Sequence, residues 1–541
     1  MTKIRPYLTL FLIIAGLVVA GKLVQAFILL PLVEAAFQGD SFEYLNQIIA
    51  QHRLKNPDVR NLAFYRSQVP VYINRLIFLA AYTTIFLWVL IKDNFKVIRA
   101  FFNEEKSAFS LGILRVVVFS LILYINFPVS ISELSHLGTD SLSPPLGWPD
   151  SLAAFLIQPI VSSTLSVLFT TFCIGGLIGF YTRYMIIGAT ITGLFVMGIP
   201  QFFGKIDSYH ILWHTLVIMS FSNAGDSLSV DAWRKNLPQF NIEKATKYAI
   251  PINLIMILIG LGYFFPGIWK FTFSGFEWAF SDNLMLKMHS KWLDIGAWTP
   301  SIRIDRYPFL YQSGAFSTLI LELGFLFGIF FKKTRAFFLI LAFTFHLFVD
   351  IFMHILFAST MVMFVAFLPW QQILASLPLD LNFTGSKNSQ STFYKKGLKF
   401  TGIVIIAGYL ITGSLLIKTW PFALYPTFAS LESSTIPSIL IKGYDNEGTL
   451  VASTIPLLNE HFKEEFGSSG ARLRGYMQNI INSSNRDSTK YQPLIAAFLS
   501  DFEQSPQDIA EITFYQIRLS THPDSLGDKY TVVEKMYSRD N

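Results

Sequence analysis

The sequence predicts an all-α polytopic membrane helix bundle of about 10–11 spans, with a small C-terminal α+β domain outside the membrane. The chain of 541 residues is 52% hydrophobic and only 14% charged, with a mean hydropathy of +0.46, whereas soluble proteins carry about 25% charged residues. Apolar runs near the roughly 20 residues that cross the hydrocarbon core recur up to about residue 420. The segment 421–541 is polar, with no such run.

This composition excludes a soluble enzyme, a disordered chain and a nucleic-acid binder. The net charge of +6 is spread over a large chain, and basic membrane loops explain it better than a nucleic-acid surface. One cysteine, Cys173, excludes an intrachain disulfide framework and a cysteine metal site. The first partner that we expect is therefore the lipid bilayer.

Eleven apolar runs are candidate spans. The run 208–222 is short for a full span, and 336–372 is either a tight hairpin or one long helix with a broken end. The first run is longer than the roughly 7–15 apolar residues of a signal peptide, so we expect an uncleaved anchor. The runs are 7–30, 74–91, 111–130, 152–181, 184–203, 208–222, 249–269, 312–331, 336–355, 357–372 and 400–419.

Loop charges set the expected orientation. With a cytoplasmic N-terminus, most of the Lys and Arg residues fall in inside loops, and the outside loop 134–151 has none. This bias follows the positive-inside rule. Eleven spans then place the C-terminus outside, and an error of one span would reverse everything after it.

Four regions follow from these patterns. We expect an N-terminal pair of spans (1–105), a membrane core (106–375), a cytoplasmic linker with the last span (376–420) and an extracytoplasmic α+β domain (421–541).

Within the last region, alternation around a turn at Gly448 predicts a β-hairpin. Residues 471–482 and 491–503 have helical periodicity, and Tyr515, Ile517 and Leu519 alternate in the expected last strand.

Ionisable residues inside apolar helices usually mark function or a specific pairing. Arg115 and Arg183 lie near the inner ends of their spans, where snorkelling or a structural ion pair explains them. Glu322 lies mid-span with no local partner in the sequence. We expect it to pair with one of these arginines or to face a polar cavity.

Histidines form two helical patterns. His346, Asp350 and His354 share one stripe at i, i+4 and i+8, and His210 and His214 form an i, i+4 pair. Facing pairs of this kind can bind a metal. The alternative is a set of hydrogen-bonded membrane histidines, and because the known metal signatures are absent, no metal is predicted.

Lys270 belongs to the same outer level as these histidines. Among Phe265, Trp269 and Phe271, its charged form is disfavoured, which would make it a usable base in an outward-facing pocket. The alternative is an ordinary interfacial lysine beside an aromatic belt.

The segment from Tyr263 to Phe271, Tyr-Phe-Phe-Pro-Gly-Ile-Trp-Lys-Phe, followed by Ser274-Gly275 and Trp278, resembles a known family. This is the horizontally transferred transmembrane domain, the membrane core of vitamin K-dependent gamma-carboxylase. Further pieces match in order over about 110–375, including Gly267 of the Gly-x-x-Lys motif. They are Leu114-Arg115-Val116, Gly179-Phe180-Tyr181-Thr182-Arg183, Asn223-Ala224-Gly225, Ser229-Val230-Asp231, Glu322-Leu323-Gly324-Phe325, Phe345-His346 and Phe367-Leu368.

The resemblance implies that Lys270 deprotonates vitamin K hydroquinone or another quinol, and that His346 belongs to the same site. Oxygen would then yield a strong base that removes a glutamate γ-proton before carbon dioxide adds. The chain departs from the family where a second histidine is expected, because Ser208 stands there and His210 is two residues away. The tail shows no match to the family's propeptide-binding region.

Three functions follow from the sequence. The first is a membrane enzyme acting on a quinol-like lipid, or on a peptide, at the outer face. The second is a non-catalytic scaffold whose helices bind lipid and whose tail binds a partner. The third is a helix-bundle metal site.

Overall fold

The computed structural model describes two compact units. Described are residues 5–54, 61–92, 94–126, 142, 144–203, 209–242, 244–296, 298–376, 392–423, 428–466, 470–482, 488–501, 509–525 and 530–540. The membrane unit comprises Met1–Gly275, Leu319–Thr344 and Phe357–Ala429. The C-terminal unit comprises Phe276–Thr318, Phe345–Leu356 and Ser430–Asn541.

Nine helices within the described residues are long and apolar enough to cross a membrane, so the chain is an integral multi-pass membrane protein. A continuous helix suits lipid because it satisfies its backbone groups internally. The nine are α1 (Arg5–Val24) continuing through η1 (Gln25–Leu29) into α2 (Leu30–Gln38), α4 (Leu62–Lys92), α6 (Ala108–Asn126), α8 (Pro159–Ile178), α9 (Thr182–Val196) with η4 (Ile199–Phe202), α12 (Thr246–Ser274), α15 (Pro308–Gly328), α16 (Lys332–Met353) and α19 (Thr392–Ser414).

The other two expected spans are short. Residues 208–222 contain α10 (His210–Ser220), and 357–372 breaks into α17 (Ala358–Met361), η6 (Val362–Phe367) and α18 (Trp370–Ala375). Most of α10 is buried. Backbone that is not a continuous spanning helix is tolerated at membrane depth only where protein or a water-filled cavity surrounds it. The stretch 336–372 is therefore a full helix followed by short pieces.

Contacts within the membrane unit show which helix ends lie together. The short strands β1 (Lys106–Ser107) and β2 (Lys244–Ala245) pair antiparallel, so α6 and α12 begin at the same end. The indole of Trp269 donates to the Gly413 carbonyl at 2.8 Å, which joins the last turns of α12 and α19. Alternating crossings give this arrangement when the shorter apolar helices His210–Ser220 and Ala358–Phe367 count as crossings beside the nine long ones. The end that faces the cytoplasm stays a prediction from loop charges.

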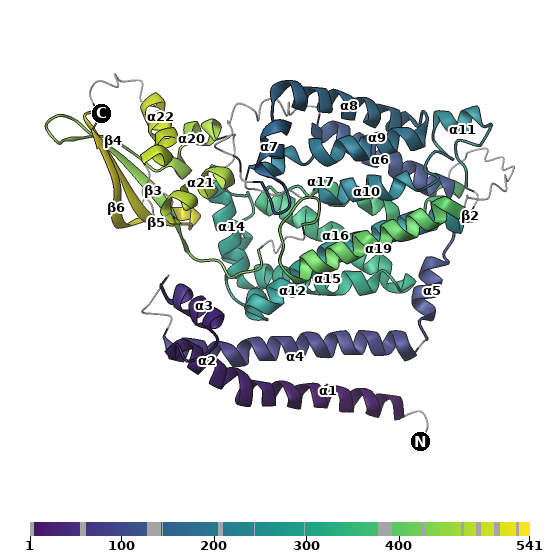
Figure 1. Ribbon diagram of the computed structural model, residues 1–541, viewed down its shortest axis with the longest axis horizontal. Helices are drawn as coiled ribbons and strands as arrows, with labels where there is room; N and C mark the ends of the chain where they lie inside the picture. Colours follow the sequence, from purple (N-terminus) through teal and green to yellow (C-terminus); the bar gives the residue numbers. More distant parts are fainter. Residues whose placement is uncertain are drawn as a thin grey trace. The chain divides into compact units, whose positions relative to one another are not determined.

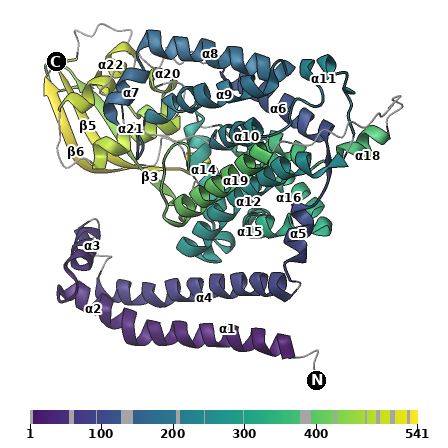
Figure 2. The same ribbon diagram turned by 45° about the vertical axis from the view of Figure 1, so that its right-hand side comes forward.

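The N-terminal helices form a hairpin in which α1 and α4 lie side by side (Figures 1 and 2). The ammonium of Lys22 on α1 donates to Asn74 Oδ1 on α4 at 2.7 Å. Many apolar side chains of both helices are exposed, as a lipid-facing surface requires. The remaining short helices of the membrane unit are α3 (Glu43–Leu54), α5 (Lys96–Phe102), α7 (Asp150–Leu156) and α11 (Val230–Arg234).

The C-terminal unit contains a four-stranded antiparallel sheet in the order β4-β3-β5-β6. The predicted hairpin is confirmed as β3 (Thr435–Tyr444) and β4 (Leu450–Thr454). Its turn is stabilised by the Asp445 carboxylate, which accepts the backbone N–H groups of Glu447 and Thr449, and Gly448 adopts a φ of 79°.

The expected last strand is β5 (Glu511–Ser520), but it is not the last. A further strand, β6 (Tyr530–Asp540), pairs along its whole length. Residues 530–535 of β6 are exposed on both faces of this edge strand. Hence the strand has no alternation of apolar and polar residues, which is the pattern by which the sequence reveals strands.

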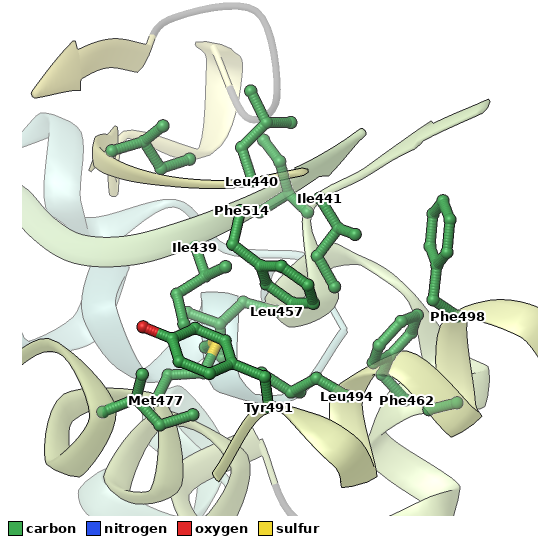
Figure 3. Packing of buried hydrophobic residues seen from close by; sticks show 14 of the residues in the cluster. Ile439, Leu440, Ile441, Leu457, Phe462, Met477, Tyr491, Leu494, Phe498 and Phe514 are labelled. Carbon is green, nitrogen blue, oxygen red and sulfur yellow. The ribbon is translucent and has the colours of Figure 1, made fainter. Parts of the chain in front are cut away.

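Helices cover the sheet and form one hydrophobic core with it. Figure 3 shows Ile439 and Phe514 of the sheet lying against Tyr491 and Met477. Both predicted helices are present, as α21 and α22. The helical elements are α20 (Glu460–Glu465), α21 (Gly470–Asn482), α22 (Gln492–Asp501), η7 (Pro456–Leu458), η8 (Ser488–Tyr491) and η10 (Pro523–Ser525).

The segment Phe276–Thr318 folds with this domain and not with the spans around it. It contains α13 (Glu277–Phe280), α14 (Asn283–Asp294) and η5 (Ile304–Arg306). The guanidinium of Arg474 donates to Ser290 Oγ at 2.8 Å and pairs with Asp294. The C-terminal domain is thus tied by ionic contacts to the segment that follows α12.

Candidate functional site

Gly267 lets α12 and α15 approach each other closely. A Cβ added at Gly267 would lie 2.7 Å from the Glu322 Cβ and 3.1 Å from its carbonyl carbon. Two turns earlier, a Cβ at Gly260 would lie 3.1 Å from the Leu326 Cα. The two glycines therefore form a flat strip along α12 where the two backbones meet.

Lys270 lies at i+3 from Gly267 and so faces the same neighbour. Its Nζ is 2.6 Å from Glu322 Oε1 and 2.8 Å from Oε2. The two side chains are only 4% and 6% exposed. The ammonium therefore binds both carboxylate oxygens in a charge-assisted, water-poor contact.

This pair differs from what the sequence led us to expect of both residues. The aromatic neighbours of Lys270 predicted a desolvated amine, whereas the structure gives it a buried carboxylate partner. Glu322 pairs with this lysine and with neither expected arginine. Two opposite charges at membrane depth form a neutral unit, which avoids the cost of burying either charge alone.

Arg115 and Arg183 bind backbone carbonyls. Arg115 is fully buried, and its Nη1 donates to the Gly176 carbonyl at 2.6 Å. Its Nη2 contacts the Leu228 carbonyl. Arg183 donates to the Ser222 carbonyl at 3.2 Å. Arg115 therefore joins α6, the end of α8 and the loop before α11, so snorkelling does not describe it.

His210 and His214 lie on α10 with ring centroids 6.5 Å apart. His214 is fully buried, and its Nδ1 is 3.1 Å from the hydroxyl of Tyr409 on α19. The ring of His210 lies 5.9 Å from the same tyrosine ring. This arrangement is the hydrogen-bonded membrane histidine that the sequence offered as the alternative to a metal ligand.

His346, Asp350, His354 and Trp278 belong to the C-terminal unit, so the structure gives no geometry between them and Lys270. His346 is buried beside Phe345, with ring centroids 5.1 Å apart. The expected stripe ends at Asp350, because α16 stops at Met353 and His354 adopts a φ of 49°. His354 packs edge-on against Trp298 at 4.2 Å.

Trp278 is buried, and its carbonyl accepts a hydrogen bond from the Asn283 side chain at 3.2 Å.

No metal site emerges from the part of the chain that the structure describes. Within those residues there is no group of three or more His, Cys, Asp and Glu side chains able to hold a metal ion. Ser208, the position where the chain departs from the family pattern, lies outside the described residues.

The sequence reasoning missed a buried polar network in the C-terminal unit. His289 Nε2 lies 3.0 Å from Asp305 Oδ2, and Arg303 binds both oxygens of that carboxylate at 2.9 and 2.8 Å. Arg303 also reaches Asp524 at 2.9 Å, and His522 packs against His289 with ring centroids 5.2 Å apart. The only signal was a cluster of ionisable residues between two apolar runs.

Burial and hydrogen bonds together set the protonation of this network. Burial lowers the pKa of His289 below its ordinary value, although the Asp305 hydrogen bond opposes the effect. Burial acts to raise the pKa of Asp305, but hydrogen bonds from Arg303 and His289 outweigh it and lower that pKa. The network therefore contains a neutral histidine between charged groups near neutral pH.

No family model, no curated protein and no solved structure matches this chain.

Proposed function

We propose that the membrane unit holds a proton-transfer site for a quinol-like lipid, with Lys270 and Glu322 as the reacting pair. The observation that carries this proposal is the contact of one buried ammonium with both oxygens of one buried carboxylate. Ionisable groups are costly inside a membrane and are retained mainly where they serve function or specific pairing.

The pair has the charge balance that such a step requires. One ammonium and one carboxylate are neutral together, and the carboxylate can accept one proton from a quinol hydroxyl. The pair then carries one positive charge beside the quinol anion, so no net charge is created in the low-dielectric interior. A bound quinol would supply the acidic hydroxyl and the redox chemistry.

Resemblance to the vitamin K-dependent gamma-carboxylase core supports the choice of substrate class. The motif that carries the resemblance contains Gly267 and Lys270, and Gly267 is the residue that lets Lys270 reach Glu322. His346 is a further candidate member of this site by resemblance. We further propose that the reaction carboxylates a glutamate side chain, as in the carboxylase that the membrane core resembles.

The full-length protein in lipid nanodiscs tests this proposal. With dissolved oxygen as the oxidant and carbon dioxide as the second substrate, we expect vitamin K hydroquinone, menaquinol or ubiquinol to support epoxide formation or incorporation of carbon dioxide into a glutamate peptide. Lys270→Ala and Glu322→Gln should each lose this activity. Lys22→Ala is the matched control, because Lys22 also lies in an apolar span but binds Asn74. Absence of wild-type activity with all three quinols would overturn the proposal.

A charge swap separates catalysis from support of the fold. The double variant Lys270→Glu with Glu322→Lys keeps one buried ion pair but exchanges the positions of its amine and carboxylate. We expect a folded, inactive protein. A swap variant with full quinol activity would show that the pair only joins two helices.

A scaffold that binds a partner through the C-terminal domain is the second candidate. The favouring observation is the edge strand β6, whose residues 530–535 are exposed and include Val532 and Val533. An unpaired edge is a surface on which an extended peptide can add a strand. A stoichiometric partner that co-purifies with wild type and with Lys270→Ala, but not with Val533→Lys, would favour this function.

We propose that the C-terminal domain is extracytoplasmic and the N-terminus cytoplasmic. Cys173 is buried. A cysteine introduced by Glu447→Cys at the exposed hairpin turn is therefore the thiol that we expect to react. It should react with a membrane-impermeant maleimide in intact cells. Reaction only after lysis would contradict this orientation.

A further inference from the structure

One face of α4 packs on both helices of the Lys270–Glu322 pair. Arg75, Phe78 and Tyr82 lie at i, i+3 and i+7, so they share a stripe of the helix. The ring of Phe78 lies 4.6 Å from that of Phe271 on α12. The ring of Tyr82 lies 5.4 Å from that of Phe327 on α15. The N-terminal hairpin, which is outside the family resemblance, thus touches both halves of the site.

Arg75 binds the helical turn that directly follows Lys270. Its Nη1 donates to the Thr272 carbonyl at 2.8 Å and also contacts the Phe273 carbonyl. These carbonyls belong to the last turn of α12, where no further helical N–H can reach them. A cation at this end also interacts favourably with the negative end of the helix dipole. Arg75 therefore fixes the last turn of α12, which directly follows Lys270.

Tyr82 binds the turn that carries Glu322. Its hydroxyl donates to the Leu323 carbonyl at 2.9 Å, and Leu323 directly follows Glu322 in α15. A phenol inside an apolar span needs such a partner, because lipid offers none. One stripe of α4 thereby binds the turn after Lys270 through Arg75 and the turn at Glu322 through Tyr82.

We propose that Arg75 and Tyr82 are positioning residues that keep Lys270 Nζ within hydrogen-bond distance of both Glu322 oxygens. The inference rests on the proposed role of this pair. Through these two residues, the N-terminal hairpin becomes a structural part of the site. The flat strip at Gly267 allows α12 and α15 to approach, and α4 fixes the register at which they do so.

Labelling of Lys270 tests this role without any assay of activity. Full-length protein in nanodiscs is treated with a membrane-permeant amine-reactive ester, and modification of Lys270 relative to Lys22 is followed by mass spectrometry. We expect Tyr82→Phe and Arg75→Gln to increase the labelling rate of Lys270 about tenfold, as the loss of one hydrogen bond would. Glu322→Gln is the positive control, and Tyr65→Phe on the same helix is the matched control.

The outcomes are distinct. Arg75→Lys should largely restore protection, because it keeps a cation beside the carbonyls. Tyr82→Phe removes a single oxygen atom, so the test survives if Arg75→Gln does not fold. Unchanged labelling in Tyr82→Phe, with an increase in Glu322→Gln, would overturn the positioning role. Faster labelling in a protein that turns over no quinol would support the positioning role while removing the proposed reaction.

Discussion

The membrane unit and the C-terminal unit bury charge in two different ways. In the membrane unit, Lys270 and Glu322 form a neutral pair, and Arg115 donates to backbone carbonyls. In the C-terminal unit, Arg303 bridges Asp305 and Asp524. His289 extends that network as a fourth member.

The difference reflects the dielectric around each group. Lipid offers no water or counterions, so a buried charge there needs one opposite charge or a set of dipoles. The C-terminal unit contacts water at Asp524, which is about half exposed, so extra charges remain partly solvated. We infer that the buried charges of Lys270, Glu322 and Arg115 are each difficult to remove alone, whereas charges of the C-terminal network can be removed or titrated more gradually.

The largest expected effect is that of Lys270→Ala on stability. The substitution leaves the Glu322 carboxylate buried without a partner, and we expect a loss of about 3–5 kcal/mol. The double variant Lys270→Ala with Glu322→Ala should regain part of it, because no uncompensated charge remains. Unfolding of the full chain in mixed micelles measures both. A double variant no more stable than the single one would contradict the ion-pair interpretation.

Arg115→Met tests the carbonyl-bound charge. We expect a loss of about 2–3 kcal/mol, because several carbonyls lose a charged hydrogen-bond donor. Arg183→Met is the matched control, since this side chain is only half-buried and donates to Ser222 at 3.2 Å. The same unfolding measurement applies. Equal losses in the two variants would show that burial does not decide the effect.

Gly267→Ala tests the close approach that lets the pair form. The added methyl group would meet the Glu322 Cβ at 2.7 Å, and we expect a loss of about 1–3 kcal/mol from the resulting displacement. Gly262→Ala lies on the same helix with nothing within 4 Å. It should be neutral, or stabilising by up to about 1 kcal/mol. The measurement is the difference in free energy of unfolding between the two variants. Equal effects would contradict the close packing of α12 on α15 at Gly267.

The smallest expected effect is a pH dependence in the C-terminal unit. Burial lowers the pKa of His289, so below about pH 6.5 the unfolded chain takes up a proton before the folded chain does. Stability should therefore fall as the pH drops below about 6.5 and level off below the folded pKa of His289. Hydrogen exchange of α14 at pH 7.5 and 5.5 measures this.

His289→Asn is the control for this prediction, because it removes the titrating group. Its exchange should depend less on pH over the same interval. An unchanged dependence would assign the effect to other groups. Asp305 and Asp524, whose pKa values are lowered, act at lower pH, because their stabilisation is lost only as they become protonated.

The sequence alone determined the membrane character of the chain and most of its elements. Hydrophobic runs decide this because lipid demands about 20 apolar residues for each crossing. The hairpin at Gly448 was also predictable, since turn chemistry is local. The sequence also marked 208–222 as short for a full span and offered a broken helix end for 336–372, and the structure has the short α10 and a full helix followed by short pieces there. Strand β6 was not predictable. Its residues 530–535 are exposed on both faces, so this edge strand has no alternating pattern.

Tertiary structure alone decided the partners within the site. Lys270 and Glu322 are 52 residues apart in sequence, and Arg75 and Tyr82 come from a hairpin that no motif linked to them. The sequence could mark these residues as costly in a membrane, because that cost is a property of each side chain. Which buried charges pair with each other depends on the helix packing at Gly267 and on the stripe of α4. That packing follows from the whole fold.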